Sequence, residues 1–290
     1  MQRATTIFGR LGLCIAAILL MAASAQAETA PATPWQGPEH VRVRVIAADA
    51  GVPSNGQVRL GLQFQLAPGW KIYWRTPGDA GIPPIFDWSR SSNVERAEVQ
   101  WPAPKRFTVF GFETFGYNNE VVLPIDVAAA SPDDPLAVRL DVQFAACSNI
   151  CVPMEAAFAI DLAAQSATPH SGVQAELIDY YLQRVPRVGD GGSIKISGIT
   201  AVGDGQFKQL TVEATTDMGF LAPDILLEMT GRYQFSRPKT RFSNNGRRVA
   251  FEVAVDTGRQ AAALVGQAVV ITVVDGPASV EHRAVVAKGF

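Results

Sequence analysis

Hydrophobic and polar residues alternate in short runs along most of the chain beyond His40, and glycine, proline or asparagine separates the runs. A period of two is the pattern of a strand with one buried face. Short runs at this spacing are typical of an antiparallel β-sandwich. In the first half of the chain, the pattern predicts strands at Val41–Val45, Val58–Leu66, Val121–Val127, Val138–Phe144 and Ala156–Leu162.

One stretch has helical periodicity instead. Apolar residues recur at spacings of three and four between Val173 and Val185, and Pro186 ends the pattern. Polar residues 165–171 come before it, and a glycine-rich loop ends at Gly192. Residues 165–192 are therefore predicted to be a linker that contains a helix. Its apolar positions are Leu177, Ile178, Tyr181 and Leu182.

A second series of strands follows, and within it Asn244-Asn-Gly246 is a strong hairpin signal. The pattern thus predicts an all-β protein, with a first sandwich in residues 28–164 and a second, smaller β-sandwich in residues 193–290. The predicted strands of the second sandwich are Ser193–Ile199, Phe207–Ala214, Ile225–Met229, Arg247–Val255, Val269–Val274 and Ser279–Ala287.

Residues 1–27 have the pattern of a secretory signal peptide. Arg3 and Arg10 give a basic start, an apolar run begins at Leu11, and Ala25-Gln-Ala27 is a small-x-small cleavage site. Cleavage after Ala27 would export the mature protein and remove Cys14 with the leader. We therefore expect the mature chain in an oxidising compartment, where disulfides persist.

Charge and hydropathy give no support for nucleic-acid or membrane partners. Without the two leader arginines the chain has 23 basic and 27 acidic residues, and such weak acidity gives no reason to expect nucleic acid or an anionic membrane. No later segment has the roughly 18 consecutive apolar residues that a membrane span requires. The mature chain is thus predicted to contain no membrane span.

Cys147 and Cys151 are the only cysteines beyond the leader. Four positions of extended strand span about 13 Å, so a disulfide between them requires a bend after the strand that ends at Phe144. Closing so small a loop contributes only about 2 kcal/mol in the chain-entropy model, which makes a purely structural bridge a poor explanation. We favour reversible thiol chemistry, because a short, tight ring is easily reduced.

Two alternatives stay open for the cysteine pair. The two thiolates, with nearby Met154, could hold Cu(I) in a copper-tolerance protein. The bridge could also be inert, in an adhesion or scaffold sandwich. A zinc site has little support because the three histidines are scattered: His40, His170 and His282.

The pattern gives less specific predictions for other polar and aromatic residues. Glu155 and Asp141 are near the cysteines in sequence and could assist proton transfer, although solvated charges at strand ends are commoner. A basic stretch in the second half is read as a solvated sheet edge: Arg237, Lys239, Arg241, Arg247 and Arg248. The aromatic residues are read as packing of the sandwich core and edges: Trp70, Tyr73, Trp74, Trp88 and Trp101.

A series of ordered motifs resembles one known family. The series covers about residues 35–165. It resembles the N-terminal periplasmic domain of DsbD-type thiol:disulfide interchange proteins in the order and the content of its motifs. The resemblance is closest to their suppressor-of-copper-sensitivity, ScsB-like relatives. The motifs are Pro68-Gly-Trp-Lys-Ile-Tyr-Trp74, Pro77-Gly-Asp-Ala-Gly-Ile-Pro-Pro84, Trp101-Pro-Ala-Pro104, Phe110-Gly-Phe112, Gly116-Tyr117, Leu123-Pro124 and Cys147-x3-Cys151-Val-Pro153.

The resemblance implies a fold, a reaction and partners. It implies an immunoglobulin-like sandwich whose cysteine pair takes electrons from a membrane-embedded thiol reductase and passes them to periplasmic thioredoxin-fold proteins, with no cofactor. Cys151 would form the mixed disulfide and Cys147 would resolve it. Phe110 or Phe112 would be the ring of a cap loop that covers the site. The expected function is therefore periplasmic thiol:disulfide exchange.

The chain departs from the family pattern in two respects. Thr108 and Val109 stand where better-studied members have acidic residues beside the cap aromatic, and those members also have a longer loop between the cysteines. Full-length members continue into a membrane domain and a thioredoxin-like domain, whereas this sequence ends at Phe290. We therefore expect the electron donor to be a separate polypeptide.

Overall fold

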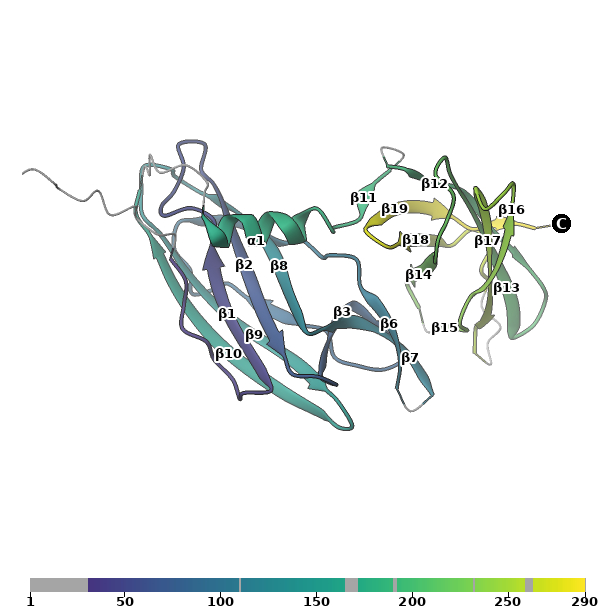
Figure 1. Cartoon of the computed structure of the whole chain (residues 1–290), viewed down its shortest axis with the longest axis horizontal. Coiled ribbons are helices and arrows are strands. Elements are labelled where there is room, and N and C mark those ends of the chain that lie inside the picture. Colours follow the sequence, from purple (N-terminus) through teal and green to yellow (C-terminus); the bar gives the residue numbers. More distant parts are fainter. Residues whose placement is uncertain are drawn as a thin grey trace, which may run out of the picture.

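The structure is a computed structural model of the 290-residue chain, and it describes residues 31–109, 111–164, 172–189, 192–231, 233–258 and 263–289. The predicted signal peptide and the candidate cap residue Phe110 lie outside these ranges. Figure 1 shows two β-sandwiches end to end, with one helix lying along the first of them. The predicted all-β class, with two sandwiches and a connecting helix, is confirmed. The domain boundaries at 164 and 192 stay predictions.

The first sandwich consists of two antiparallel sheets. One has the order β1-β2-β8-β5, and the other has the order β10-β9-β3-β7-β6 with β4 paired to β9. The second sheet carries both cysteines. The strands are β1 (Val41–Ala47), β2 (Gln57–Leu66), β3 (Lys71–Gly78), β4 (Ile85–Asp87), β5 (Val94–Val99), β6 (Lys105–Val109), β7 (Phe112–Asn118), β8 (Glu120–Ala129), β9 (Leu136–Cys147) and β10 (Cys151–Leu162).

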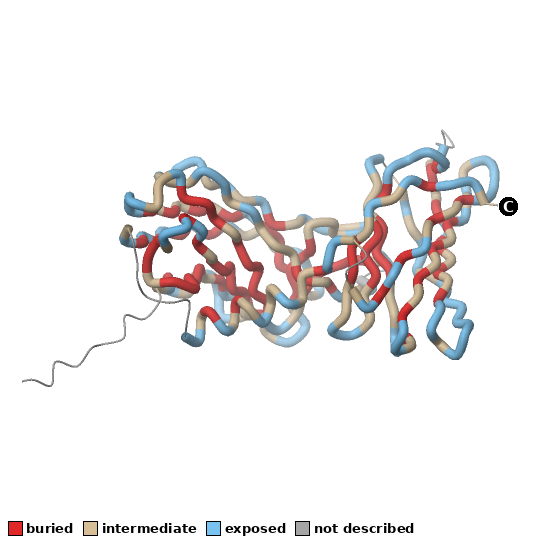
Figure 2. The backbone as a smooth tube through the Cα atoms, turned by 90° about the horizontal axis from the view of Figure 1, so that it is seen from above, coloured by how far each residue is buried: buried red, intermediate tan, exposed pale blue. Residues whose placement is uncertain are grey.

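The alternating pattern of the sequence becomes the core between these sheets. Along β9 every second residue from Leu136 to Phe144 is buried, and Phe64 of the facing sheet meets Phe144 with ring centroids 5.2 Å apart. In Figure 2 the buried residues lie inside each sandwich and the exposed ones on its outer loops. Burial of this apolar surface is the main stabilising term of the fold.

Helix α1 (Val173–Leu182) covers the outer face of the β1-β2-β8 sheet. Its buried Ala175 and Ile178 pack against Ile46 and Val122. Gly61 of β2 lies below the helix, where a Cβ atom would be 2.6 Å from Val122 Cγ1 and 2.9 Å from Ile178 Cγ1. The missing side chain at this position is what allows the helix to approach the sheet.

We expect Gly61→Ala to lower the free energy of unfolding by about 1–3 kcal/mol, because the added methyl group overpacks the contact between helix and sheet. Chemical denaturation of the oxidised protein measures the change. The control is Gly192→Ala, where a Cβ would meet no atom closer than 3.9 Å. Equal stability of the two variants would contradict the packing role of Gly61.

The second sandwich also has two sheets, and its core lies between them. Their orders are β11-β19-β18-β14 and β15-β17-β13-β12-β20, with β16 also paired to β17. The strands are β11 (Arg187–Val188), β12 (Ile194–Val202), β13 (Phe207–Thr216), β14 (Asp224–Met229), β15 (Gln234–Phe235), β16 (Lys239–Ser243), β17 (Arg248–Asp256), β18 (Ala268–Asp275), β19 (Ala278–Val285) and β20 (Ala287–Lys288).

The predicted hairpin at Asn244 is confirmed, because β16 and β17 pair antiparallel on either side of it. Asn244, Asn245 and Gly246 all have positive φ, which the asparagine and glycine of such turns tolerate. No helix in the described ranges is long and apolar enough to cross a membrane.

Candidate functional site: a disulfide at the end of a hairpin

Strands β9 and β10 form a long hairpin, and the two cysteines close it. Their register pairs Cys147 directly with Cys151, and Ser148, Asn149 and Ile150 form the loop between them. The two cysteines form a disulfide, with their Cα atoms 4.1 Å apart. The predicted bend exists, but it begins after Cys147 and not after Phe144, because the ladder of β9 continues to the first cysteine.

The two sulfur-bearing residues differ in exposure. Cys147 is fully buried, in a small cluster with Tyr73 and Ala145. Cys151 is exposed, and Ile150 beside it has 67% of its surface exposed. Of the two, Cys151 is therefore the candidate for attack by an incoming thiolate, and Cys147 is the candidate leaving thiol.

Tyr73 of β3 reaches both sulfurs from the neighbouring strand. Its hydroxyl donates a hydrogen bond to Cys147 Sγ at 3.0 Å and lies 3.4 Å from Cys151 Sγ. The pairing of Lys71 with Cys147 and of Ile72 with Ala146 places Tyr73 on the face of the sheet that carries the disulfide. Burial raises the pKa of the Tyr73 phenol above its usual value of 10.0, so the group stays a donor at neutral pH.

The Tyr73 ring is held by the loop that follows β3. Gly81 lies directly against it, at a positive φ of 129°. A Cβ atom at Gly81 would be 2.4–2.6 Å from three ring atoms. The ring and the loop are thus packed as closely as a glycine allows, so a shift of the loop would change the packing of the ring.

A buried lysine lies on the same face of the sheet. Lys71 is 8% exposed, pairs with Cys147 across the strands, and has its ammonium 5.5 Å from the centroid of the Phe107 ring. Burial lowers the pKa of Lys71. A positive charge here would stabilise a thiolate at Cys147 more than it would stabilise a neutral thiol.

We expect Lys71→Met to raise the pKa of the Cys147 thiol by up to about one unit. Reduction of the disulfide by glutathione at pH 7 should then slow by about three- to tenfold, because Cys147 is the leaving thiolate. The pH dependence of thiolate absorbance in the reduced protein measures the pKa. Lys71→Met should also stabilise the fold, because the lowered pKa of Lys71 means that the charged lysine opposes folding below that pKa. Lys105→Met is the control, since Lys105 is exposed and bonds to Asn118. An unchanged thiol pKa in Lys71→Met would contradict the effect.

The candidate cap loop connects β6 and β7. Phe110 is outside the described residues, and Phe112 has 49% of its surface exposed. Acidic residues are absent at Thr108 and Val109, but Glu113 follows Phe112, and Thr108 donates a hydrogen bond to its Oε1 at 2.7 Å. A carboxylate is therefore present at the base of this loop, from the other strand of the hairpin. The cap role stays a prediction.

The remaining candidate residues do not converge on the sulfurs. Met154 lies three positions from Cys151 and hence on the opposite face of β10, where it packs against the core. Glu155 is exposed and about 13 Å of extended strand from Cys151. The guanidinium of Arg90 donates three hydrogen bonds to the Asp141 carboxylate. Neither carboxylate is placed to contact the cysteine sulfurs as the Tyr73 hydroxyl does.

The disulfide is not part of a larger cluster of metal-ligating side chains in the ranges that the structure describes. There, no group of three or more histidine, cysteine, aspartate or glutamate side chains is arranged to hold a metal ion. His170 lies outside those ranges. With Met154 turned into the core, the cysteine pair is the whole candidate donor set.

The sequence did not predict Tyr73 as a candidate site residue, because Tyr73 lies in a run with Trp70 and Trp74 that indicates packing. Trp74 is indeed fully buried in the core. Alternation gave a usable signal: residues 71 and 73 share one face of the strand, and residues 72 and 74 share the other. This alternation places Tyr73 on the face away from the core, and that separates it from Trp74.

The fold and the site define a class: an immunoglobulin-like β-sandwich with an accessible disulfide at the end of a hairpin. Residues 42–162 match the family model described as thiol:disulfide interchange protein DsbD, N-terminal. This part of the chain is a DsbD-type N-terminal domain, as the sequence motifs predicted. Residues 184–289 match a model described as a domain of unknown function, DUF8393.

A solved structure is similar over nearly the whole chain. It is the N-terminal periplasmic domain of ScsB from Proteus mirabilis, with 26% sequence identity and a TM-score of 0.72. The match covers 90% of this chain and 100% of that one, so both sandwiches are included. A comparison with curated proteins gave no match.

Proposed function

We propose that the chain is a periplasmic thiol:disulfide exchange protein that relays electrons through Cys147 and Cys151. The observation that carries the proposal is the asymmetry of the disulfide, with Cys151 exposed and Cys147 buried against the Tyr73 hydroxyl. The DsbD-type match and the periplasmic domain of ScsB support the reaction and the compartment.

Reduction begins with attack on the exposed sulfur. A thiolate of the electron donor attacks Cys151 Sγ, a mixed disulfide forms, and the electron pair of the broken bond passes to Cys147 Sγ. Tyr73 donates its hydrogen bond to the departing thiolate, where the negative charge develops. The donor's second thiolate then attacks the donor sulfur that is bonded to Cys151. This step releases Cys151 as a thiolate and leaves the donor with a disulfide.

Delivery of electrons runs through the same atoms in reverse. The Cys151 thiolate attacks the disulfide of an acceptor and forms a mixed disulfide with it. Cys147 then attacks Cys151 Sγ, the intramolecular bond re-forms, and the acceptor leaves with both of its sulfurs reduced. Two electrons and two protons move from this chain to the acceptor, and the steps need no cofactor.

The partners follow from this chemistry. A donor must supply a pair of thiols, and we propose a membrane-embedded thiol reductase, with support from the DsbD-type match. An acceptor must offer an accessible disulfide, and we propose periplasmic thioredoxin-fold proteins. Exposed apolar side chains on the segments around the site give a docking partner something to bury: Ile82, Phe112 and Ile150.

The reduction potential of the purified protein tests the proposal. We would equilibrate the protein in graded glutathione or dithiothreitol buffers and count free thiols. A potential between about −120 and −270 mV is that of known exchange proteins and would support the relay. A potential below about −300 mV would make the bridge structural and overturn the proposal.

Copper handling is the alternative for the same cysteines. Cu(I) favours thiolate and thioether ligands, and the opposite orientation of Met154 removes the thioether from the set. We therefore do not propose it as the function. Titration of the reduced protein with Cu(I) checks this point, because tight binding that needs Met154 would contradict the observed face of the strand.

A further inference from the structure

The second sandwich contacts the first on two strands of the sheet that carries the disulfide. On β3, Arg75 lies two positions after Tyr73, and its Nε donates a hydrogen bond to Glu228 of β14 at 3.1 Å. Arg75 also pairs with Glu281 of β19, and Thr76 donates its hydroxyl hydrogen bond to Glu228. Since Leu226 of β14 is buried in the core cluster of the first sandwich, this interface is apolar as well as ionic.

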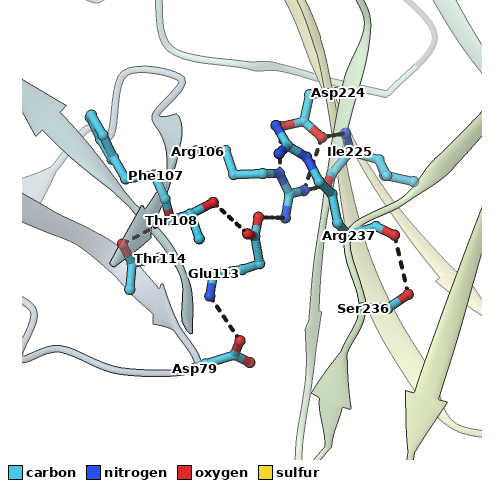
Figure 3. Close-up of polar contacts among 10 residues, drawn as sticks. All are labelled: Asp79, Arg106, Phe107, Thr108, Glu113, Thr114, Asp224, Ile225, Ser236 and Arg237. Carbon is cyan, nitrogen blue, oxygen red and sulfur yellow. Dashed lines mark hydrogen bonds and ion pairs between the residues drawn. The ribbon is translucent and has the colours of Figure 1, made fainter. Parts of the chain in front are cut away.

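On β6, a second arginine joins carboxylates of both sandwiches. Arg106 has only 8% of its side chain exposed, and its Nε and Nη2 bind Asp224 at 2.8 and 2.9 Å. Nη2 also donates to the carbonyl oxygen of Ile225 at 2.7 Å, while Nη1 lies 3.4 Å from Glu113 of β7. Figure 3 shows this guanidinium between Asp224 and Glu113. Buried, bidentate pairs of this kind fix the geometry of the groups that they join.

From Glu113 the contacts lead back toward the disulfide. The Glu113 amide donates a hydrogen bond to Asp79 Oδ2 at 3.0 Å, as Figure 3 shows, and the Asp79 amide donates to the Glu113 carbonyl oxygen at 2.9 Å. Asp79 begins the short loop in which Gly81 packs against the Tyr73 ring. An unbroken series of contacts therefore joins Asp224 of the second sandwich to the Tyr73 hydroxyl on Cys147.

We propose that the second sandwich is a positioning element for the disulfide: through Arg106 it holds Glu113 and the Asp79–Gly81 loop in place, and so it holds the Tyr73 hydroxyl against Cys147. This rests on the proposed function, because it assigns the second sandwich a part in the same exchange reaction. It gives the region 184–289 a role in setting the reactivity of cysteines that it does not contain.

A cavity lies beside the contacts of Arg106 at the interface between the two sandwiches. Its volume is about 220 Å³, and it is lined by both sandwiches, including Asp79, Glu113 and Tyr233. If the Arg106–Asp224 pair is weakened, Glu113 and the Asp79 loop have space to shift. Tyr73 would then lose its close support at Gly81.

The test uses Asp224→Asn in the full chain, because the amide keeps the shape of the carboxylate and removes its charge. The rate of reduction of the disulfide by reduced glutathione, measured across pH, should fall by about three- to tenfold, since the leaving thiolate loses part of its hydrogen bond. Asp224→Glu should restore most of the rate. Asp141→Asn is the matched control, since it weakens an arginine–aspartate pair within the first sandwich and should leave the rate unchanged.

A double-mutant cycle separates positioning through Tyr73 from any other effect. In a Tyr73→Phe background, Asp224→Asn should cause no further loss. An equal loss in both backgrounds would overturn the proposal, and so would an unchanged rate for Asp224→Asn in the parent chain.

A second variant tests the proposal if Asp224→Asn does not fold. Asp79→Ala removes an exposed link of the same series within the first sandwich, and it should slow the reduction to a similar extent. Circular dichroism checks that each variant is folded, and an unchanged rate in folded Asp79→Ala would overturn the proposal. A parent protein that does not exchange with glutathione would overturn the proposed function instead, so the two failures are distinguishable.

Discussion

Replacing Cys147 with alanine should convert the protein into a trap for its redox partners. Cys151 is exposed and can still attack a partner's disulfide, but no thiol remains to resolve the mixed disulfide. We expect the covalent complex with a thioredoxin-fold acceptor to accumulate, and net exchange to fall by at least about a thousandfold. Non-reducing electrophoresis and mass spectrometry measure both.

Cys151→Ala is the control for this trap, because its remaining thiol is the buried Cys147. We expect it to form little or no mixed disulfide. If Cys151→Ala trapped partners as well as Cys147→Ala, the assignment of Cys151 as the attacking residue would be wrong.

Removing the Tyr73 hydroxyl should slow reduction of the disulfide by about tenfold. A hydrogen bond to a charged group is worth about 1.5–3 kcal/mol, and water that reaches Tyr73→Phe recovers part of this. Stopped-flow measurement with glutathione gives the rate. The pH dependence of thiolate absorbance in the reduced protein gives the thiol pKa, which should rise because the thiolate loses a donor.

Tyr117→Phe is the matched control, since the Tyr117 hydroxyl is also buried but donates to the Pro102 carbonyl oxygen at 2.7 Å. It should lower the free energy of unfolding and leave the rate of exchange unchanged. Equal rates for Tyr73→Phe and the parent protein would remove Tyr73 from the mechanism.

Most strands that the sequence predicted have one buried face and a regular alternation, such as β9, β13 and β17. Strands β3, β6 and β7 were not among them. The sequences of β3 and β7 contain glycine and clustered aromatic residues, β3 also contains a proline, and β6 is only five residues long. In addition, β3 has a register irregularity between Tyr73 and Gly78. Local alternation cannot reveal such strands, because pairing with distant neighbours determines them.

Only part of the candidate site could be predicted from the sequence. The cysteine pair was predicted because two cysteines four positions apart need no tertiary information to be recognised. The contact between Tyr73 and Cys147 joins residues 74 positions apart, and the pair of Arg106 with Asp224 joins residues 118 positions apart. Each depends on how sheets and sandwiches pack. The orientation of Met154 could have been read from the period of two, once β10 was known to begin at Cys151.

The hairpin ladder has a consequence for the lifetime of the intermediates. Strands β9 and β10 are paired along their whole length, so the backbones of Cys147 and Cys151 should stay opposite each other after the sulfur–sulfur bond is cut. A resolving thiol held in this way acts at a high effective molarity. Mixed disulfides with partners should therefore be short-lived, and turnover should be limited by encounter and release of the partner proteins and not by the second sulfur transfer.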